Sequence, residues 1–360
     1  MKATYKKKTT SFEILENSFG GSFPSSIKLE APPKLPVRIV EDSFIQKIIQ
    51  LLSSRKQFRY LYSLTFKQSK NKLMEQYADT KELYVLKIVL SILPVLAWSV
   101  TFKKLFEMLL RQSPHEMHGY VSPIKKNNIY LFSHKIKSTG ADVNQVISHE
   151  NIHVLQASHG ELDMVQRAMD IERVNKYCEL HTNYNAKRES HVKYLFNKLE
   201  VEARVHELVS AFYISSRQFP LSRKEFIVCL LYSNTILEDI ESTVEIFRLQ
   251  WMKQRGSSDP KNLLNLLAEI KKYAIGMSIT SPIKISTHCT VDLALMLNTI
   301  NCPDELFNFI SFKLPHYYCN VLKLYGAISA SSKLQDEINK DRQIYDLKYK
   351  VQDSENTILT

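Results

Sequence analysis

The sequence predicts a mainly α-helical fold with a small β-sheet, an α+β class. The chain of 360 residues has only 8 glycines, well below the average share of about 7%, so tight turns and hairpins should be scarce. Hydrophobic residues make up 44% and charged residues 24%, which is typical of globular domains. Most apolar residues recur at helical spacing, whereas residues 128–133 (Asn-Ile-Tyr-Leu-Phe-Ser) form a short β-type run.

The helix that matters most for function is expected from Val143 to about Ser158. Turn and capping residues precede it at 138–142, and Gly160 is a natural stop. Apolar periodicity predicts further helices over 42–75, 162–180, 192–215, 223–250, 261–275, 303–313 and 319–345.

Composition divides the chain into five regions. The first combines a Lys6-Lys7-Lys8 start with Ser, Thr, Gly and Pro-rich sequence, which is typical of a flexible leader. The clearest internal linker reads Gly-Ser-Ser-Asp-Pro at 256–260. We expect a leader over 1–40, an N-terminal helical region over 41–125, a core with the functional site over 126–255, a C-terminal helical region over 261–345 and a tail over 346–360.

One apolar segment raises the question of a membrane. Residues 88–102 carry no charge, but this stretch is shorter than the about 20 residues that a span needs, and Pro94 interrupts it. A buried core helix is the favoured interpretation, and membrane contact through 84–102 is the alternative. Since no apolar stretch follows the basic start, no signal peptide is expected. The default location is therefore the cytoplasm, with export by another type of leader or membrane association as alternatives.

The net charge and the spacing of the cysteines argue against several classes of function. The chain has 48 basic and 37 acidic residues, but the lysines are scattered and no basic stripe is interleaved with aromatic residues, so nucleic acid is not the expected partner. The five cysteines are widely spaced and include no Cys-x-x-Cys pair. This pattern argues against a disulfide framework and against a thiolate metal site.

Residues 149–153 read His-Glu-Asn-Ile-His and carry the strongest functional signal. Positions i and i+4 of a helix lie nearly above one another, so His149 and His153 could bind one metal ion. Glu150 points to the adjacent flank, where it could act on a water molecule as general base. Two imidazole ligands and a carboxylate base are the chemistry of the His-Glu-x-x-His pattern, whose usual cofactor is one zinc ion.

A zinc site of this kind needs a third protein ligand, and three residues compete. His159 has metzincin-like spacing, but Gln156 stands where metzincins have glycine, so the helix should continue and turn His159 away. A later predicted helix contains Glu200 and Glu202. Glu202 falls on the apolar face, where a carboxylate is costly unless it is paired or binds a metal. Glu202 is therefore the preferred ligand, with Glu200 and His159 in reserve.

These motifs resemble those of zincin-type, gluzincin-like zinc metallopeptidases. The resemblance covers His-Glu-x-x-His-x-x-Gln at 149–156 and Glu-x-Glu-Ala within 200–204, a small part of the chain. It implies a zincin-like catalytic core with flanking helical regions and a glutamate as third ligand.

The implied reaction is hydrolysis of a peptide bond in a protein or peptide substrate. Zinc would activate water, and Glu150 would accept its proton and pass it to the leaving nitrogen. The run 129–133 could be an edge strand that pairs with an extended substrate. Candidate donors to the oxyanion are His206, Tyr177, Tyr184 and His181, and His206 could equally support a ligand or be a core histidine.

Two other functions remain open at this stage. One is a membrane-associated metallopeptidase anchored by 84–102. The other is a non-catalytic helical binding protein with a basic surface. The oligomeric state is not predicted.

Overall fold

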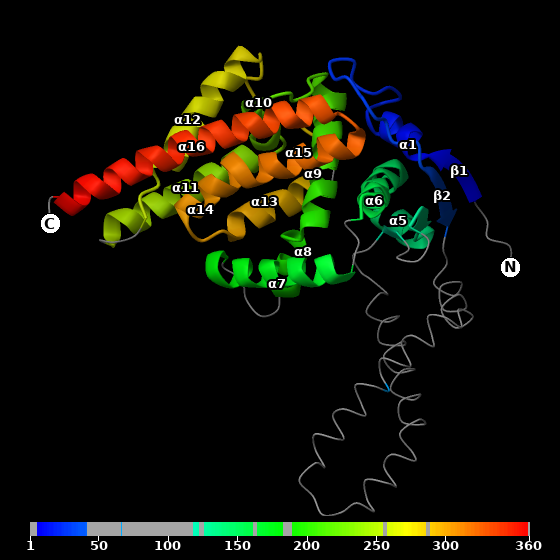
Figure 1. Ribbon diagram of the computed structural model, residues 1–360, viewed down its shortest axis with the longest axis horizontal. Helices are drawn as coiled ribbons and strands as arrows, with labels where there is room; N and C mark the ends of the chain where they lie inside the picture. The colour runs from blue at the N-terminus through cyan, green and yellow to red at the C-terminus, as the bar shows by residue number, and fades with distance from the viewer. Residues whose placement is uncertain are drawn as a thin grey trace, which may run out of the picture. The chain divides into compact units, whose positions relative to one another are not determined.

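The structure is a computed structural model (Figure 1) in which helices predominate and four short strands form one sheet, as the sequence predicts. It describes residues 6–41, 66, 118–121, 126–160, 164–182, 189–254, 258–285 and 289–358.

The four strands are ordered β1-β2-β4-β3 in the sheet. Strand β4 therefore pairs on both sides, and the expectation that residues 129–133 form a free edge strand is wrong. Its burial agrees with this position, since Ile129 is fully buried. The strands are β1 (Lys6–Thr10), β2 (Pro36–Glu41), β3 (Gly119–Val121) and β4 (Asn128–Leu131).

The chain forms two compact units. The first comprises residues 1–6, 40–120 and 130–141, and its described part includes α5 (Ser133–Thr139). There the Tyr120 ring stacks on Tyr130, with ring centroids 4.9 Å apart. The second unit comprises residues 7–39, 121–129 and 142–360.

The second unit contains the other helices whose bounds the structure describes, together with the main hydrophobic core. Within it α16 lies alongside α15, and α9 packs against α6, α13 and α15 (Figure 1). The elements are α1 (Ser11–Ser18), α6 (Val143–Ser158), α7 (Met164–His181), α8 (Glu189–Leu195), α9 (Lys198–Ser216), α10 (Arg223–Leu231), α11 (Ile236–Lys253), α12 (Lys261–Gly276), α13 (Cys289–Thr299), α14 (Pro303–Asn308), the π-helical turn η1 (Phe309–Lys313), α15 (Leu314–Tyr325) and α16 (Ile328–Ile358).

Two predicted helices are each interrupted by an asparagine. The predicted helix over 192–215 breaks at Asn197, whose side chain accepts a hydrogen bond from the backbone N–H of Leu199 and caps α9. The predicted helix over 223–250 breaks near Asn234, which adopts a left-handed φ of 50° and donates a side-chain hydrogen bond to the Ile285 carbonyl. Apolar periodicity continues across both breaks, so the local capping chemistry decides where the helices end.

The expectation of a flexible leader is wrong for residues 6–41. Helix α1 opens with a capping box in which Thr10 and Glu13 exchange hydrogen bonds. The helix packs against α6, and Phe19 is 1% exposed in the core. Asn151, inside the His-Glu-x-x-His motif, donates a hydrogen bond to the Ser11 carbonyl at 3.0 Å. The composition of the whole segment is typical of a flexible leader, but it contains a short amphipathic helix, α1, that packs on α6.

The predicted division between a core and a C-terminal helical region is also not observed. Helices α12 to α16 belong to the same compact unit as α6. The core cluster of buried residues joins them, since it includes Leu155 of α6 together with Leu263 of α12 and Leu322 of α15.

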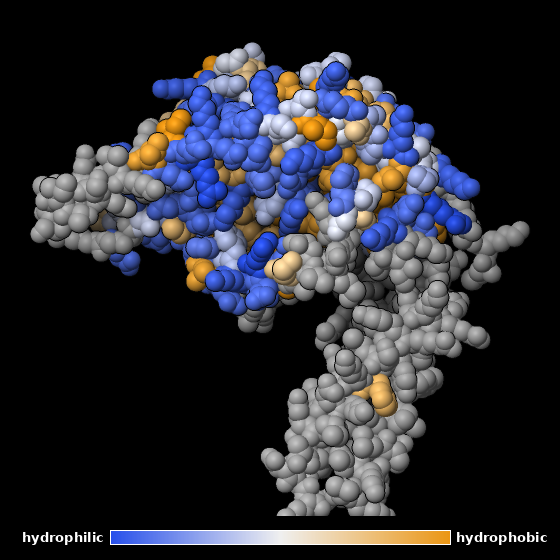
Figure 2. All heavy atoms as spheres, viewed as in Figure 1, coloured by the Kyte–Doolittle hydropathy of each residue, from blue (hydrophilic) through white to orange (hydrophobic). Residues whose placement is uncertain are grey.

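The segments expected to be helical at 42–75 and 84–102 lie outside the described residues, apart from Phe66. Among the helices that are described, none has the length and apolar character of a membrane span. Figure 2 shows hydrophilic side chains over most of the described surface in that view, with hydrophobic ones in small groups between them.

Gly326 lies in the turn between α15 and α16, in close contact with the N-terminal segment. Its substitution tests how tightly the two pack. Its φ is +84°, and a Cβ added there would lie 2.0 Å from the Ala31 carbonyl oxygen. We predict that Gly326→Ala lowers the free energy of unfolding by about 2–4 kcal/mol. Gly160 is the matched control, because its φ is +80° but no atom of the described residues lies within 4 Å of such a Cβ. Gly160→Ala should cost only about 1 kcal/mol. Equal losses in urea denaturation would contradict this close contact.

Candidate metal centre

Helix α6 presents the two motif histidines from one side. Asp142 caps the helix by accepting a hydrogen bond from the Asn144 N–H. The imidazole centroids of His149 and His153 lie 5.0 Å apart. Leu155, which is fully buried, lies on the face that packs into the core. The helix thus holds both rings on a fixed backbone, one turn apart.

Helix α9 brings Glu200 between these two rings. The Glu200 carboxylate oxygens lie 3.6 Å from His149 Nε2 and 3.6 Å from His153 Nε2. Two ligands bound at about 2.0 Å to a tetrahedral zinc ion are about 3.3 Å apart. The observed separations are close to that value. His149, His153 and Glu200 are a group found among the described residues whose ligand atoms could hold one metal ion.

The outer nitrogens of both rings are bonded to protein acceptors. His149 Nδ1 donates to Glu207 Oε1 at 2.7 Å, and His153 Nδ1 donates to Gln156 Oε1 at 2.7 Å. Each neutral ring then carries its lone pair on Nε2, which faces Glu200. Three acceptor atoms therefore converge, which favours a cation between them. Outer hydrogen bonds of this kind usually orient histidine ligands of metals.

The pKa values of the cluster also show that its surroundings stabilise a positive charge. Burial alone would lower the pKa of His149, but attraction to Glu207 and hydrogen bonds with Glu200 and Glu207 raise it well above its ordinary value. Burial alone would raise the pKa of Glu200, but the two histidines and Arg204 lower it. The pKa of His153 is lowered, chiefly by burial. The surrounding carboxylates thus favour positive charge at His149.

Glu150 is buried near the ligand group, and the pKa of its carboxyl is raised. It is 7% exposed, and burial raises the pKa of its carboxyl to about 7, with attraction to His149 opposing the shift. Repulsion from Glu200 and Glu207 adds to the increase, so the carboxyl lies within electrostatic reach of the ligand group. A carboxyl with a pKa near neutrality can both accept and return a proton.

Tyr194 and Arg204 surround Glu200 on its other side. The Tyr194 hydroxyl donates to Glu200 Oε2 at 2.6 Å. Arg204 is 4% exposed; its Nη1 lies 3.7 Å from Glu200 Oε2, and its Nε donates to Asp292 at 3.0 Å. Since Tyr194 is 44% exposed, the site has an aromatic rim that faces solvent. No sequence pattern predicted a role for Tyr194 or Arg204 at this site.

The structure places the preferred third ligand, Glu202, outside the metal group. Glu202 is fully buried, as its position on the apolar face predicts, but its carboxylate accepts hydrogen bonds from Gln156 at 2.8 Å and Asn320 at 2.9 Å. These amide donors, with Lys198 at 3.7 Å, offset the cost of burial. The reserve residue Glu200 lies beside the histidines instead.

His159 and His206 also lie outside the group. Helix α6 continues to Ser158, as expected, and His159 is its exposed C-cap, with Nδ1 2.9 Å from the Leu155 carbonyl. His206 is fully buried and hydrogen-bonded to Ser148 and Tyr325. Burial lowers the pKa of His206 to about 3, so it is a neutral core histidine that links α6, α9 and α15.

Tyr177 and His181, two of the remaining donor candidates, make their ring contacts away from the ligand group. Tyr177 packs its ring against Phe196 and Phe309, and the His181 ring lies 5.0 Å from Tyr177. Tyr184 lies outside the described residues.

Helical spacing could have identified the residues that support the histidines. Glu207 follows Glu200 by seven residues, and Gln156 follows His149 by seven, which in each case is two turns along the same stripe of a helix. Gln156 belongs to the pattern His-Glu-x-x-His-x-x-Gln at 149–156, whereas Glu207 lies outside both sequence motifs.

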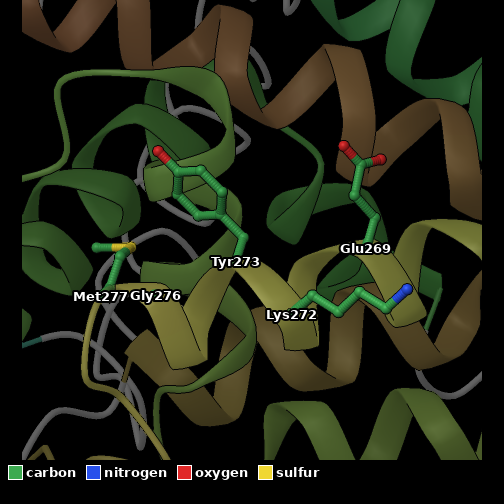
Figure 3. Close-up of a pocket in the computed structure, with 5 residues that line it drawn as sticks. All are labelled: Glu269, Lys272, Tyr273, Gly276 and Met277. Carbon is green, nitrogen blue, oxygen red and sulfur yellow. The ribbon is translucent and has the colours of Figure 1, made fainter.

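A shallow pocket elsewhere in the second unit does not belong to this centre. Figure 3 shows its lining residues, all from α12 and its C-cap: Glu269, Lys272, Tyr273, Gly276 and Met277.

No protein-family model, curated protein or solved structure matches this chain. The geometry of the centre is therefore the basis for assigning a function.

The ligand set predicts which substitutions remove the metal. Purified wild-type protein should contain about one equivalent of zinc per chain. His149→Ala and Glu200→Ala should each bind zinc at least about 100-fold more weakly, since each removes one of three protein ligands. His159→Ala is the matched control and should retain zinc. Competition with a chromophoric chelator measures these affinities. Retention of full affinity by Glu200→Ala would exclude Glu200 as a ligand.

The raised pKa of Glu150 predicts a pH-dependent stability of the metal-free protein. Its carboxyl has an ordinary pKa of 4.5 and a folded pKa of about 7, so the folded state is increasingly disfavoured as pH rises through that window. Glu150→Gln should therefore stabilise metal-free protein by up to about 3 kcal/mol at pH 8 and much less at pH 5. Urea denaturation at both pH values tests this, with Glu179→Gln, an exposed glutamate, as control. A gain that does not depend on pH would contradict the burial of a neutral Glu150.

Proposed function

We propose that this protein is a zinc-dependent hydrolase and, more specifically, a metallopeptidase. The observation that supports this most strongly is the convergence of His149 Nε2, His153 Nε2 and the Glu200 carboxylate, with both Nδ1 atoms bonded to protein acceptors. Two histidines and one glutamate are a typical ligand set of catalytic zinc, in which the fourth position stays open.

The donor atoms also favour zinc over other ions. Imidazole nitrogens suit zinc, whereas magnesium and calcium prefer oxygen ligands throughout. A bound zinc ion supplies Lewis acidity, which polarises a carbonyl group and lowers the pKa of water. His149, His153 and Glu200 have side chains that are 14–18% exposed, so small molecules can reach the centre from solvent.

The chain's own residues provide the remaining chemistry. Glu150 is buried within electrostatic reach of the ligand group, and in this proposal it accepts a proton from the attacking water and returns it to the leaving nitrogen. The hydroxyl of the half-exposed Tyr194 donates to Glu200 at 2.6 Å and helps to hold that carboxylate beside the histidines. Together, these groups fit the hydrolysis of an amide bond.

The proposal is tested by substitution of the general base. Glu150→Gln should keep the zinc content of wild type but lower the rate of peptide cleavage by about 100-fold or more, because general-base catalysis contributes a factor of this size. The assay follows new N-termini by mass spectrometry in a library of peptides from a digested proteome, with wild-type, Glu150→Gln and His159→Ala proteins.

Two results would contradict the proposal. Cleavage by Glu150→Gln at the wild-type rate would exclude Glu150 as base. Zinc-containing wild-type protein that cleaves no peptide in the library, or cleavage that continues unchanged after zinc is chelated, would contradict the assignment as a metallopeptidase.

A further inference from the structure

Beyond the three ligands, we infer that Glu202 is a positioning residue that acts on the metal centre through Gln156. The inference rests on the proposed zinc site and concerns how one of its histidines is oriented. It assigns a role to a fully buried carboxylate that lies outside the ligand group.

The first step is the orientation of the Gln156 amide. Its Nε2 donates to two acceptors, Glu202 Oε2 at 2.8 Å and the Leu199 carbonyl at 3.1 Å. Both of these partners only accept hydrogen bonds, so the NH₂ group must face them. The Gln156 oxygen therefore has to face His153 Nδ1, at 2.7 Å.

The second step is the tautomer of His153. Because the Gln156 oxygen only accepts, His153 Nδ1 must carry the hydrogen, which leaves the lone pair on Nε2. Nε2 is the atom that faces Glu200 across 3.6 Å. If the Gln156 amide turned over, its NH₂ group would face Nδ1 and favour hydrogen on Nε2, the form that cannot bind a metal through Nε2.

The third step is the anchoring of Glu202. Its other oxygen, Oε1, accepts from Asn320 on α15 at 2.9 Å and lies 3.7 Å from Lys198 Nζ. Glu202, on α9, is thus an acceptor at both oxygens and is held between Gln156 on α6 and Asn320 on α15. Successive hydrogen bonds link Asn320, Glu202, Gln156 and His153. They fix which atom donates and which accepts at each step from α15 to the metal centre.

The two histidines are supported differently. His149 donates directly to the Glu207 carboxylate at 2.7 Å, and that acceptor cannot present a hydrogen when ionised. His153 donates to a neutral amide, which is ambiguous by itself because either end can face the ring. Glu202, together with the Leu199 carbonyl, removes this ambiguity, which gives the fully buried carboxylate a role.

A double-mutant cycle in zinc affinity tests this dependence. The proteins are wild type, Gln156→Met, Glu202→Met and the double variant, with zinc dissociation constants from chelator competition. Loss of an outer hydrogen bond to a histidine ligand typically weakens metal binding by about 10–100-fold. We expect Gln156→Met to fall in that range, Glu202→Met to lose about 10-fold, and the double variant to bind no more weakly than Gln156→Met.

A control separates positioning from general stability. Glu337 is a partly buried glutamate on α16 that accepts a hydrogen bond from the Arg223 N–H at 3.0 Å. Glu337→Met should lower the melting temperature of the metal-free protein but leave zinc affinity unchanged. If Glu202→Met does not fold, Glu202→Gln replaces it in the same cycle.

Three outcomes are decisive. A double variant no weaker than Gln156→Met supports the inference. Losses that multiply, or a Glu202 variant with wild-type zinc affinity, would overturn it while leaving the zinc site intact. A wild-type protein that binds no zinc would overturn the proposed function itself.

Discussion

The contact between helices α6 and α9 is the constraint on which the candidate centre depends. Neither helix carries a complete metal site: α6 supplies two histidines one turn apart, and α9 supplies the carboxylate that lies 3.6 Å from each of them. The same contact brings Glu207 to His149 and Glu202 to Gln156. A small shift of one helix along the other would therefore separate ligands and their hydrogen-bonding partners together.

Helix α9 is central because it uses more than one face. It packs against α6, α13 and α15, and Arg204 reaches Asp292 on α13 while His206 reaches Tyr325 on α15. The N-terminal segment also contacts α6, because Asn151 of α6 donates a hydrogen bond to the Ser11 carbonyl. Rigid support on several sides is what a metal centre requires, because its ligands must be positioned before the ion binds.

The sequence predicted the parts of this arrangement that depend on local chemistry. The start and end of α6, the one-sided placement of His149 and His153, and the rotation of His159 away from them follow from capping and helical spacing. The choice of Glu202 over Glu200 did not follow, because it assumed a helix with one buried face. The buried position of Glu202 was predicted correctly, but Asn320, 118 residues further along the chain, supplies one of its donors.

The N-terminal segment shows the same limit. Its composition is that of a flexible leader, yet α1 buries Leu15 and Phe19 against helices that are distant in sequence. A partner surface formed only by folding decides whether such a segment is ordered, and no local pattern reveals that surface.

X-ray absorption spectroscopy at the zinc K-edge of the purified, zinc-bound protein tests the central claim most directly. The account predicts nitrogen and oxygen scatterers at about 2.0–2.2 Å, an outer-shell signal of two imidazole rings and no sulfur. A sulfur shell near about 2.3 Å, or a spectrum without imidazole scattering, would show that zinc is held elsewhere and would contradict the centre formed by His149, His153 and Glu200.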